Sequence, residues 1–173
     1  MNNNTYIHKY LETLIGKDDI CVDMTAGNGH DTFYLASRCK KVYAFDISEL
    51  AIERTAKRVE DFDNVILIND NHINVDRYLH QKARLFIFNL GYLPHSNETV
   101  ITKAEETLIA FTKAYQLLED KGYIVITFYL GHKGGHGEYY LLEDYIIKNR
   151  LQITEVYSQH KLNSPLTYFI KKC

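Results

Sequence analysis

The chain has 173 residues, of which 46% are hydrophobic, 13% aromatic and 24% charged, with a formal net charge of -2 at pH 7. This length predicts one domain, residues 1–173, around one sizeable core. The slightly negative net charge excludes a strongly basic composition, and the charges are spread along the chain. No apolar run reaches the roughly 20 residues of a membrane helix. Three widely separated cysteines and the lack of a signal peptide pattern predict a cytoplasmic protein that does not bind membranes.

In chain order, a short helical segment at about 5–16 precedes five apolar, β-type runs. These runs are residues 20–24, 41–46, 64–70, 83–89 and 123–130. Helical patterns lie between and after them, notably at 48–61, at about 98–119 and at about 138–150, and Ser48 is a candidate N-cap. Strands that alternate with helices predict parallel βαβ units and an α/β sheet covered on both faces.

The pattern changes near the end of the chain. Two further β-type runs, 152–160 and 165–173, are separated only by residues 161–164. No helix fits in that gap, so the two runs predict an antiparallel hairpin at the edge of the sheet. A seven-stranded sheet of this kind resembles the Rossmann-like fold of S-adenosylmethionine-dependent methyltransferases.

The stretch DMTAGNGHDT, residues 23–32, follows the first strand. Gly27 and Gly29 let the backbone pass close to a ligand, and the helix that begins at His30 offers unpaired N–H groups. Thr32 stands where a dinucleotide-binding motif has its third glycine, which weakens the pyrophosphate interpretation. Asp23 instead suits the ammonium group of a methionine moiety. A tight βα connection without a ligand is the alternative.

Polar residues also follow the second and third strands. Asp46 is placed to accept both ribose hydroxyls of an adenosine, with Ser48 close enough to add a contact. Asp70, Asn71 and His72 stand where the adenine ring is held in this fold. Ser48 and Asn71 are equally suited to helix capping, so the alternative of a purely structural role stays open.

The candidate catalytic residues follow the fourth strand, in FNLGYLP, residues 88–94. Methyl transfer to an amine requires a neutral lone pair aimed at the methyl carbon. The carbonyl of Asn89 can accept an amine N–H bond and aim that lone pair, while Tyr92 can stack on the acceptor base. The alternative is that residues 89–91 form only a polar turn.

A glycine-rich segment, residues 128–138, follows the fifth strand and predicts a flexible loop on the same edge. His132, His136 and Glu138 are its candidate substrate-binding residues, and either histidine could relay the amine proton. Zinc binding by the same residues is disfavoured because the glycines do not preform a ligand set, so no metal is predicted.

Together, DMTAGNGHDT, VYAFDIS, NDNH, FNLGYLP and the GHKGG segment with Glu138 resemble small bacterial proteins labelled rRNA methylases. That family is similar to the tRNA 5-aminomethyl-2-thiouridine methyltransferases, known as MnmM. The resemblance implies N-methylation of the wobble uridine with S-adenosylmethionine as donor. It also implies cofactor contacts by Asn28, His30, Asp46, Ser48, Asn71 and His72, and an acceptor pocket at Asn89 and Tyr92. Residues 95–97 and Lys133 depart from the family pattern on the substrate side.

Other functions remain open at this point. The acceptor could be an rRNA base or a small amine, or the chain could be a non-catalytic S-adenosylmethionine-binding module. With no separate RNA-binding domain, a tRNA anticodon region would be held by the pocket rim and a second subunit. Apolar residues of the predicted helix at 98–119 suit either the core or a homodimer contact.

Overall fold

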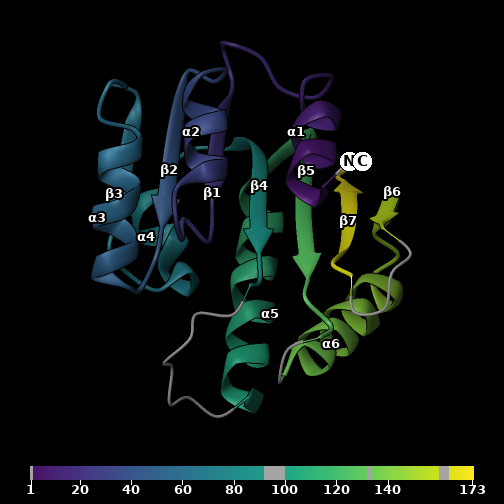
Figure 1. The fold of residues 1–173 in the computed structure, drawn as a ribbon. Helices are drawn as coiled ribbons and strands as arrows, with labels where there is room; N and C mark the ends of the chain where they lie inside the picture. Colours follow the sequence, from purple (N-terminus) through teal and green to yellow (C-terminus); the bar gives the residue numbers. More distant parts are fainter. Residues whose placement is uncertain (1, 92–99, 132–133, 160–163) are drawn as a thin grey trace.

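The computed structural model describes residues 2–91, 100–131, 134–159 and 164–173. Within these ranges the chain forms a seven-stranded sheet in the order β3-β2-β1-β4-β5-β7-β6 (Figure 1). The strands are β1 Ile20–Asp23, β2 Lys41–Phe45, β3 Val65–Ile68, β4 Ala83–Asn89, β5 Leu118–Phe128, β6 Gln152–Ser158 and β7 Leu166–Lys171. The first five strands pair in parallel, so their carboxyl ends meet at one edge.

Helices connect these strands and cover both faces of the sheet (Figure 1). They are α1 Asn3–Leu11, α2 His30–Ala36, α3 Glu49–Arg58, the 3-10 turn η1 His72–Asn74, α4 Val75–Tyr78, α5 Val100–Leu117 and α6 Gly135–Lys148. None of the helices in the described parts of the chain is both long and apolar enough to span a bilayer.

Two hydrophobic clusters occupy the two faces of the sheet. One gathers Phe86 and Phe88 of β4 with Phe111 of α5 and residues of α4 and α6. The other gathers Leu85 and Ile87 of β4 with residues of α1 and α2. Successive side chains of a strand point to opposite faces, so β4 feeds both clusters and is buried on both sides. This arrangement confirms the doubly wound α/β fold.

The carboxyl-terminal strands confirm the predicted hairpin. β6 and β7 pair antiparallel, and β7 also pairs antiparallel with β5. The later strand therefore lies inside the sheet and the earlier strand forms its edge. In β7 the run from Thr167 to Ile170 is buried, whereas Val156 of β6 keeps 51% of its side-chain surface exposed, as expected for an inner strand and an edge strand.

Several predicted element boundaries need correction. The first helix ends at Leu11 rather than near Gly16. β5 begins at Leu118, five residues before the predicted run at Tyr123, because the Leu118–Gly122 segment continues the strand through a register irregularity opposite β4. The connection after β5 is shorter than the predicted loop at 128–138, because α6 already begins at Gly135. Gly135 is required by packing, since a Cβ atom there would lie 2.1 Å from the carbonyl oxygen of Tyr129.

Candidate active site

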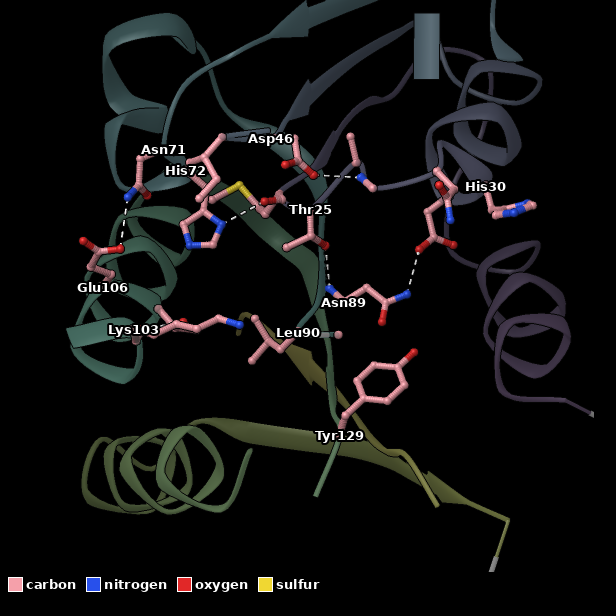
Figure 2. Close-up of a pocket in the computed structure, with 18 of the residues that line it drawn as sticks. Thr25, His30, Asp46, Asn71, His72, Asn89, Leu90, Lys103, Glu106 and Tyr129 are labelled. Atoms are coloured by element: carbon pink, nitrogen blue, oxygen red, sulfur yellow. Dashed lines mark hydrogen bonds between the residues drawn. The ribbon is translucent and has the colours of Figure 1, made fainter. Parts of the chain in front are cut away.

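A pocket lies at the carboxyl edge of β1, β2, β3 and β4 (Figure 2). It encloses ≈ 300 Å³, a size at the lower end for small-molecule sites. The predicted residues that line it are Gly27, Asn28, His30, Asp46, Asp70, Asn71, His72 and Asn89. Asp23, Gly29, Ser48, His136 and Glu138 do not line it. Tyr92 and His132 lie outside the described residues.

The glycine turn is shaped by backbone conformation and by packing. Gly29 caps α2 with a φ of 79°, a left-handed value that favours glycine. A Cβ atom at Gly29 would lie 3.0 Å from both the Cα and the Oγ1 of Thr55 in α3. Gly29 is therefore needed where α2 and α3 approach each other. Gly27 lies in the pocket wall, and its N–H donates to the Asp46 carboxylate at 2.9 Å.

Asp46 joins the ends of the first two βα connections. Its Oδ2 accepts from the Gly27 N–H and its Oδ1 accepts from the Ser48 N–H at 2.9 Å. A carboxylate oxygen has two lone pairs, so each oxygen keeps one for a ligand hydroxyl. Ser48 accepts from the Ala51 N–H at 3.3 Å and caps α3. Ser48 thus serves as the N-cap of α3, and Asp46 rather than Ser48 lines the pocket.

His72 and Asn71 form the far end of the pocket. His72 Nδ1 lies 2.8 Å from the carbonyl oxygen of Met24, so Nδ1 carries the proton. Burial lowers the pKa of His72, and its Nε2 is then an acceptor in the neutral ring. Asn71 accepts from the Ile73 N–H at 3.1 Å to cap η1, and donates to Glu106 at 3.0 Å. Asn71 therefore combines a capping role with a place in the pocket wall.

Asp70 lies beside them and is held by neighbouring donors. Asn74 donates to its Oδ1 at 3.0 Å and Tyr78 to its Oδ2 at 2.8 Å. These hydrogen bonds lower the pKa of Asp70, so the group is ionised at neutral pH. Asp70 adds a fixed negative charge to this end of the pocket.

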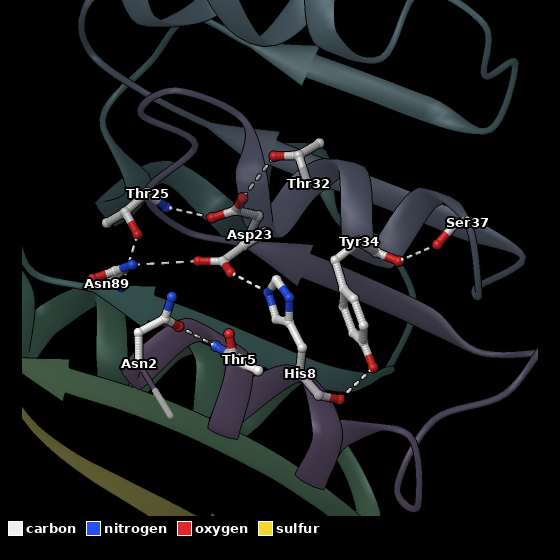
Figure 3. Close-up of polar contacts among 10 residues, drawn as sticks. Asn2, Thr5, His8, Asp23, Thr25, Thr32, Tyr34, Ser37 and Asn89 are labelled. Atoms are coloured by element: carbon white, nitrogen blue, oxygen red, sulfur yellow. Dashed lines mark hydrogen bonds and ion pairs between the residues drawn. The ribbon is translucent and has the colours of Figure 1, made fainter. Parts of the chain in front are cut away.

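The expectation that Asp23 contacts a ligand ammonium is not met. The Asp23 side chain is fully buried and accepts from the Thr32 hydroxyl at 2.6 Å and from the Thr25 N–H at 3.1 Å (Figure 3). Burial, followed by the nearby charge of Asp31, raises the pKa of Asp23 to about 7. The carboxyl group stabilises the glycine turn through these two hydrogen bonds, because the Asp23 side chain points into the protein interior rather than into the pocket. Asp31 lines the pocket in its place.

Asn89 confirms the polar residue expected at the end of β4. Its backbone N–H donates to Thr25 Oγ1 at 2.8 Å. Its side-chain Nδ2 lies 3.4 Å from Asp31 Oδ2. The carbonyl oxygen Oδ1 is buried and has no hydrogen-bond partner within the described structure. Buried polar atoms are normally paired, so among the described residues this oxygen keeps its capacity to accept a hydrogen bond.

Several pocket residues were not predicted from the sequence. Glu106 and Thr107 of α5 form one wall beside Lys103, and their spacing from Lys103 places all three on one helical face, which is a signal that the sequence contains. Tyr129 follows β5 and lines the pocket, so the strand-end rule that selected Asn89 also selects this residue. Asp31 stands in the first turn of α2, next to the predicted His30.

The glycine-rich segment contributes differently from the prediction. His136 and Glu138 stand in the first turns of α6 rather than in a loop. Glu138 is buried behind the α5 wall, where Thr107 donates to it at 2.9 Å. Burial raises the pKa of Glu138, while Lys103 and Thr107 partly oppose this. Among the described residues no cluster of three potential metal ligands occurs.

The pocket chemistry fits S-adenosylmethionine. Asp46 offers acceptor lone pairs where a ribose would lie, and neutral His72 offers an acceptor for an adenine amino group. Gly27 and the start of α2 present backbone where the methionine part would pass. The fold and this pocket together define the class of Rossmann-like S-adenosylmethionine-dependent methyltransferases.

Comparisons with known proteins place the chain within this class. The model of the family described as "Putative rRNA methylase" matches residues 42–170, and the chain belongs to that family. The crystal structure of SMU.1697c from Streptococcus mutans, described as "a putative methyltransferase" and solved in complex with SAH, is 32% identical with a TM-score of 0.86. That alignment covers 100% of this chain and 99% of the other. The crystal structure of a protein described as "putative rRNA-methylase" from Clostridium thermocellum is also 32% identical, with a TM-score of 0.88 over 100% and 98% of the two chains.

A curated relative is the chloroplastic tRNA (mnm(5)s(2)U34)-methyltransferase of Arabidopsis thaliana. It is 34% identical over 152 residues, which are 79% of this chain and 56% of the relative. The chain thus spans about half the length of that curated relative.

Proposed function

We propose that this protein is an S-adenosylmethionine-dependent N-methyltransferase that converts 5-aminomethyl-2-thiouridine to 5-methylaminomethyl-2-thiouridine at the wobble position of tRNA. The name of the Arabidopsis relative supports this substrate. The observation that carries the proposal is the buried carbonyl oxygen of Asn89 in the pocket, which has no hydrogen-bond partner among the described residues. An aliphatic amine supplies the N–H donor that such an oxygen lacks.

The cofactor would occupy the pocket from His72 to the start of α2. His72 and Asp70 would face the adenine, Asp46 the ribose, and Gly27, Asn28 and His30 the methionine part. Gly29, Ser48 and Asp23 support this binding surface through packing, capping and hydrogen bonds. S-adenosylmethionine supplies a methyl carbon activated by its sulfonium sulfur.

The protein's own contribution is alignment of the amine. Thr25 fixes the backbone of Asn89, and register places Asn89 opposite Thr127 of β5. The carbonyl oxygen then accepts one amine N–H and leaves the lone pair directed at the methyl carbon. Tyr129 lines the pocket beside Asn89 and would border the base. Tyr92, His132 and His136 remain candidate substrate contacts.

The remaining parts of the proposal concern partners and place. The anticodon region of tRNA would rest on the rim of the pocket, where Lys103 supplies a positive charge. Ile109 of α5 is 48% exposed, so this helix has apolar surface available for a homodimer contact. A cytoplasmic location is supported by the three free thiols at Cys21, Cys39 and Cys173.

Nucleoside mass spectrometry tests the proposal directly. Transfer RNA from cells lacking the gene is incubated with the purified protein and S-adenosylmethionine, then digested to nucleosides. We expect 5-aminomethyl-2-thiouridine to be replaced by a nucleoside heavier by one methylene group. Unchanged tRNA, with methylation found instead in rRNA or a small amine, would overturn the substrate. Unchanged nucleosides with tight cofactor binding would favour a non-catalytic binding module.

A further inference from the structure

A chain of polar contacts links the first helix to Asn89 (Figure 3). His8 Nε2 in α1 lies 2.7 Å from Asp31 Oδ1. Asp31 Oδ2 lies 3.4 Å from Asn89 Nδ2. The Asp31 carboxylate of α2 therefore joins α1 to β4, two elements that are distant in the sequence.

The amide of Asn89 has two orientations that fill the same space. Its backbone is fixed by the hydrogen bond to Thr25, so a rotation that exchanges Oδ1 and Nδ2 remains the main freedom of the side chain. Asp31 breaks this symmetry, because an ionised carboxylate only accepts hydrogen bonds. The Nδ2 group must then face Asp31, and Oδ1 is left buried without a partner among the residues that the structure describes.

Tyr129, another neighbour of Asn89, does not determine which orientation the amide takes. It forms a hydrogen bond with Asn89 that lowers its pKa, against the larger upward effect of burial. A phenol group both donates and accepts, so Tyr129 would tolerate either orientation of the amide. Asp31, which can only accept, is thus the neighbour that favours one orientation of the Asn89 amide over the other.

Asp31 is itself held in place by a rigid partner. The His8 ring stacks on Tyr34 with centroids 3.9 Å apart and planes 12° apart. The Tyr34 hydroxyl donates to the His8 carbonyl oxygen at 2.5 Å. Since Asp31 accepts, His8 Nε2 is the donor, and this bond occupies Oδ1 and leaves Oδ2 for Asn89.

We propose that Asp31, held by His8, is a positioning residue that fixes the Asn89 amide with its carbonyl oxygen toward the acceptor amine. This inference rests on the proposed function, because it assigns a role in amine methylation. The reversed amide would present N–H donors to the amine. A hydrogen bond from Nδ2 to the amine nitrogen would occupy the lone pair that has to attack the methyl carbon.

The central experiment uses Asp31→Asn, which has nearly the same shape but can donate hydrogen bonds, and Asp144→Asn as control. Asp144 forms a surface ion pair with Lys148. We expect Asp31→Asn to lower kcat about 10- to 100-fold, with KM for tRNA and the calorimetric Kd for S-adenosylmethionine within about threefold of wild type. Weakened cofactor binding would overturn the inference, because Asp31 would then serve the cofactor's own ammonium group.

Exchanging the two side chains gives a sharper test. In Asp31→Asn/Asn89→Asp the carboxylate at position 89 presents an acceptor in either orientation, and the amide at position 31 supplies the donor. We expect the exchange to regain about tenfold of the kcat lost by Asp31→Asn alone. An exchange variant no faster than Asp31→Asn would contradict the inference. His8→Phe, which keeps the ring against Tyr34, is expected to lower kcat by a smaller factor than Asp31→Asn.

A measurement without substrate separates this inference from the proposed function. The side-chain ¹⁵N–¹H signals of Asn89 are identified by their loss in Asn89→Asp. We expect them to shift in Asp31→Asn and to stay unchanged in Asp144→Asn. Unshifted signals would overturn the positioning role even if tRNA is methylated. Shifted signals together with wild-type protein that leaves tRNA unmethylated would support the contact and overturn the proposed function.

Discussion

The Thr32 hydroxyl of α2 donates a 2.6 Å hydrogen bond to the buried carboxyl group of Asp23 at the end of β1. This bond and the one from the Thr25 N–H tie the end of β1 to the glycine turn and to the start of α2. They partly offset the cost of burial, which together with the charge of Asp31 still raises the pKa of Asp23 to about 7. A carboxyl group that ionises near neutral pH in the folded protein couples the turn to pH.

Asp23→Asn tests this coupling. The folded state retains a proton at Asp23 from about pH 4 to about pH 7, whereas the unfolded chain does not. The contribution of Asp23 to stability is present at low pH and lost as pH rises through this range, by at most about 1.4 kcal/mol per pH unit. Urea unfolding should show the variant gaining stability relative to wild type from pH 4 to 7. Parallel stability curves would contradict this.

Gly29→Ala should destabilise the protein. The residue needs a φ of 79°, and the new Cβ would lie 3.0 Å from Thr55 Cα. The left-handed conformation alone costs about 1–2 kcal/mol for an alanine. Gly137→Ala is the control, because nothing lies within 4 Å of its Cβ position and alanine is favoured within a helix. Equal unfolding midpoints for the two variants would argue against the packing role of Gly29.

Asp46→Asn should weaken cofactor binding. Gly27 and Ser48 donate to different oxygens of Asp46, so the amide N–H₂ group that replaces one of them would face a backbone N–H and offers no lone pair to a ribose hydroxyl. Loss of a hydrogen bond to a charged group corresponds to about 10- to 100-fold in affinity. Isothermal calorimetry with S-adenosylmethionine measures the effect, and Asp144→Asn provides the comparison. Unchanged affinity would place the ribose elsewhere.

Protonation of His72 should oppose cofactor binding. Burial lowers its pKa below 6.5, so the ring is neutral at pH 7 and its Nε2 accepts a hydrogen bond. As pH falls through this lowered pKa, the ring gains a second N–H and loses its acceptor. We expect the affinity for S-adenosylmethionine in the wild type to be constant around pH 7 and to fall only on acidification below the usual histidine range, because the pKa of His72 is lowered. The affinity of His72→Phe should be lower throughout and lack this component.

Asn89→Ala should separate binding from turnover. The variant removes the buried carbonyl oxygen while the backbone bond to Thr25 remains available. We expect kcat to fall about 100-fold with nearly normal calorimetric affinity for S-adenosylmethionine. Wild-type turnover in this variant would remove Asn89 from the mechanism.

The sequence predicted the fold and one half of the pocket because both depend on local patterns. β4 begins at Ala83 and ends at Asn89 as expected, and its apolar run, buried on both faces, leaves a polar residue at the strand end. Asp46 and His72 follow the same rule for the carboxyl ends of parallel strands.

The contacts that were missed depend on distant parts of the chain. Asp31 receives its role from His8, which lies 23 residues earlier in a separate helix, and no local pattern encodes that docking. Asp23 was assigned to the ligand because a carboxylate just ahead of the glycine turn suits an ammonium group, and the sequence does not show on which side of the turn its side chain lies. The direction of its side chain follows from the Thr32 hydroxyl in the next helix, which only the folded turn brings near.

The order of the last strands also affects how the chain folds during synthesis. β6 pairs only with β7 among the described strands, and β7 must enter between β5 and β6. When β6 leaves the ribosome it has no neighbour to pair with, and the edge of β5 stays open until β7 follows. A chain without β7 would leave the apolar half of β5 with an unpaired edge, which is a hazard for aggregation. Pairing of β7 with β5 therefore has to precede the attachment of β6 to the rest of the described sheet.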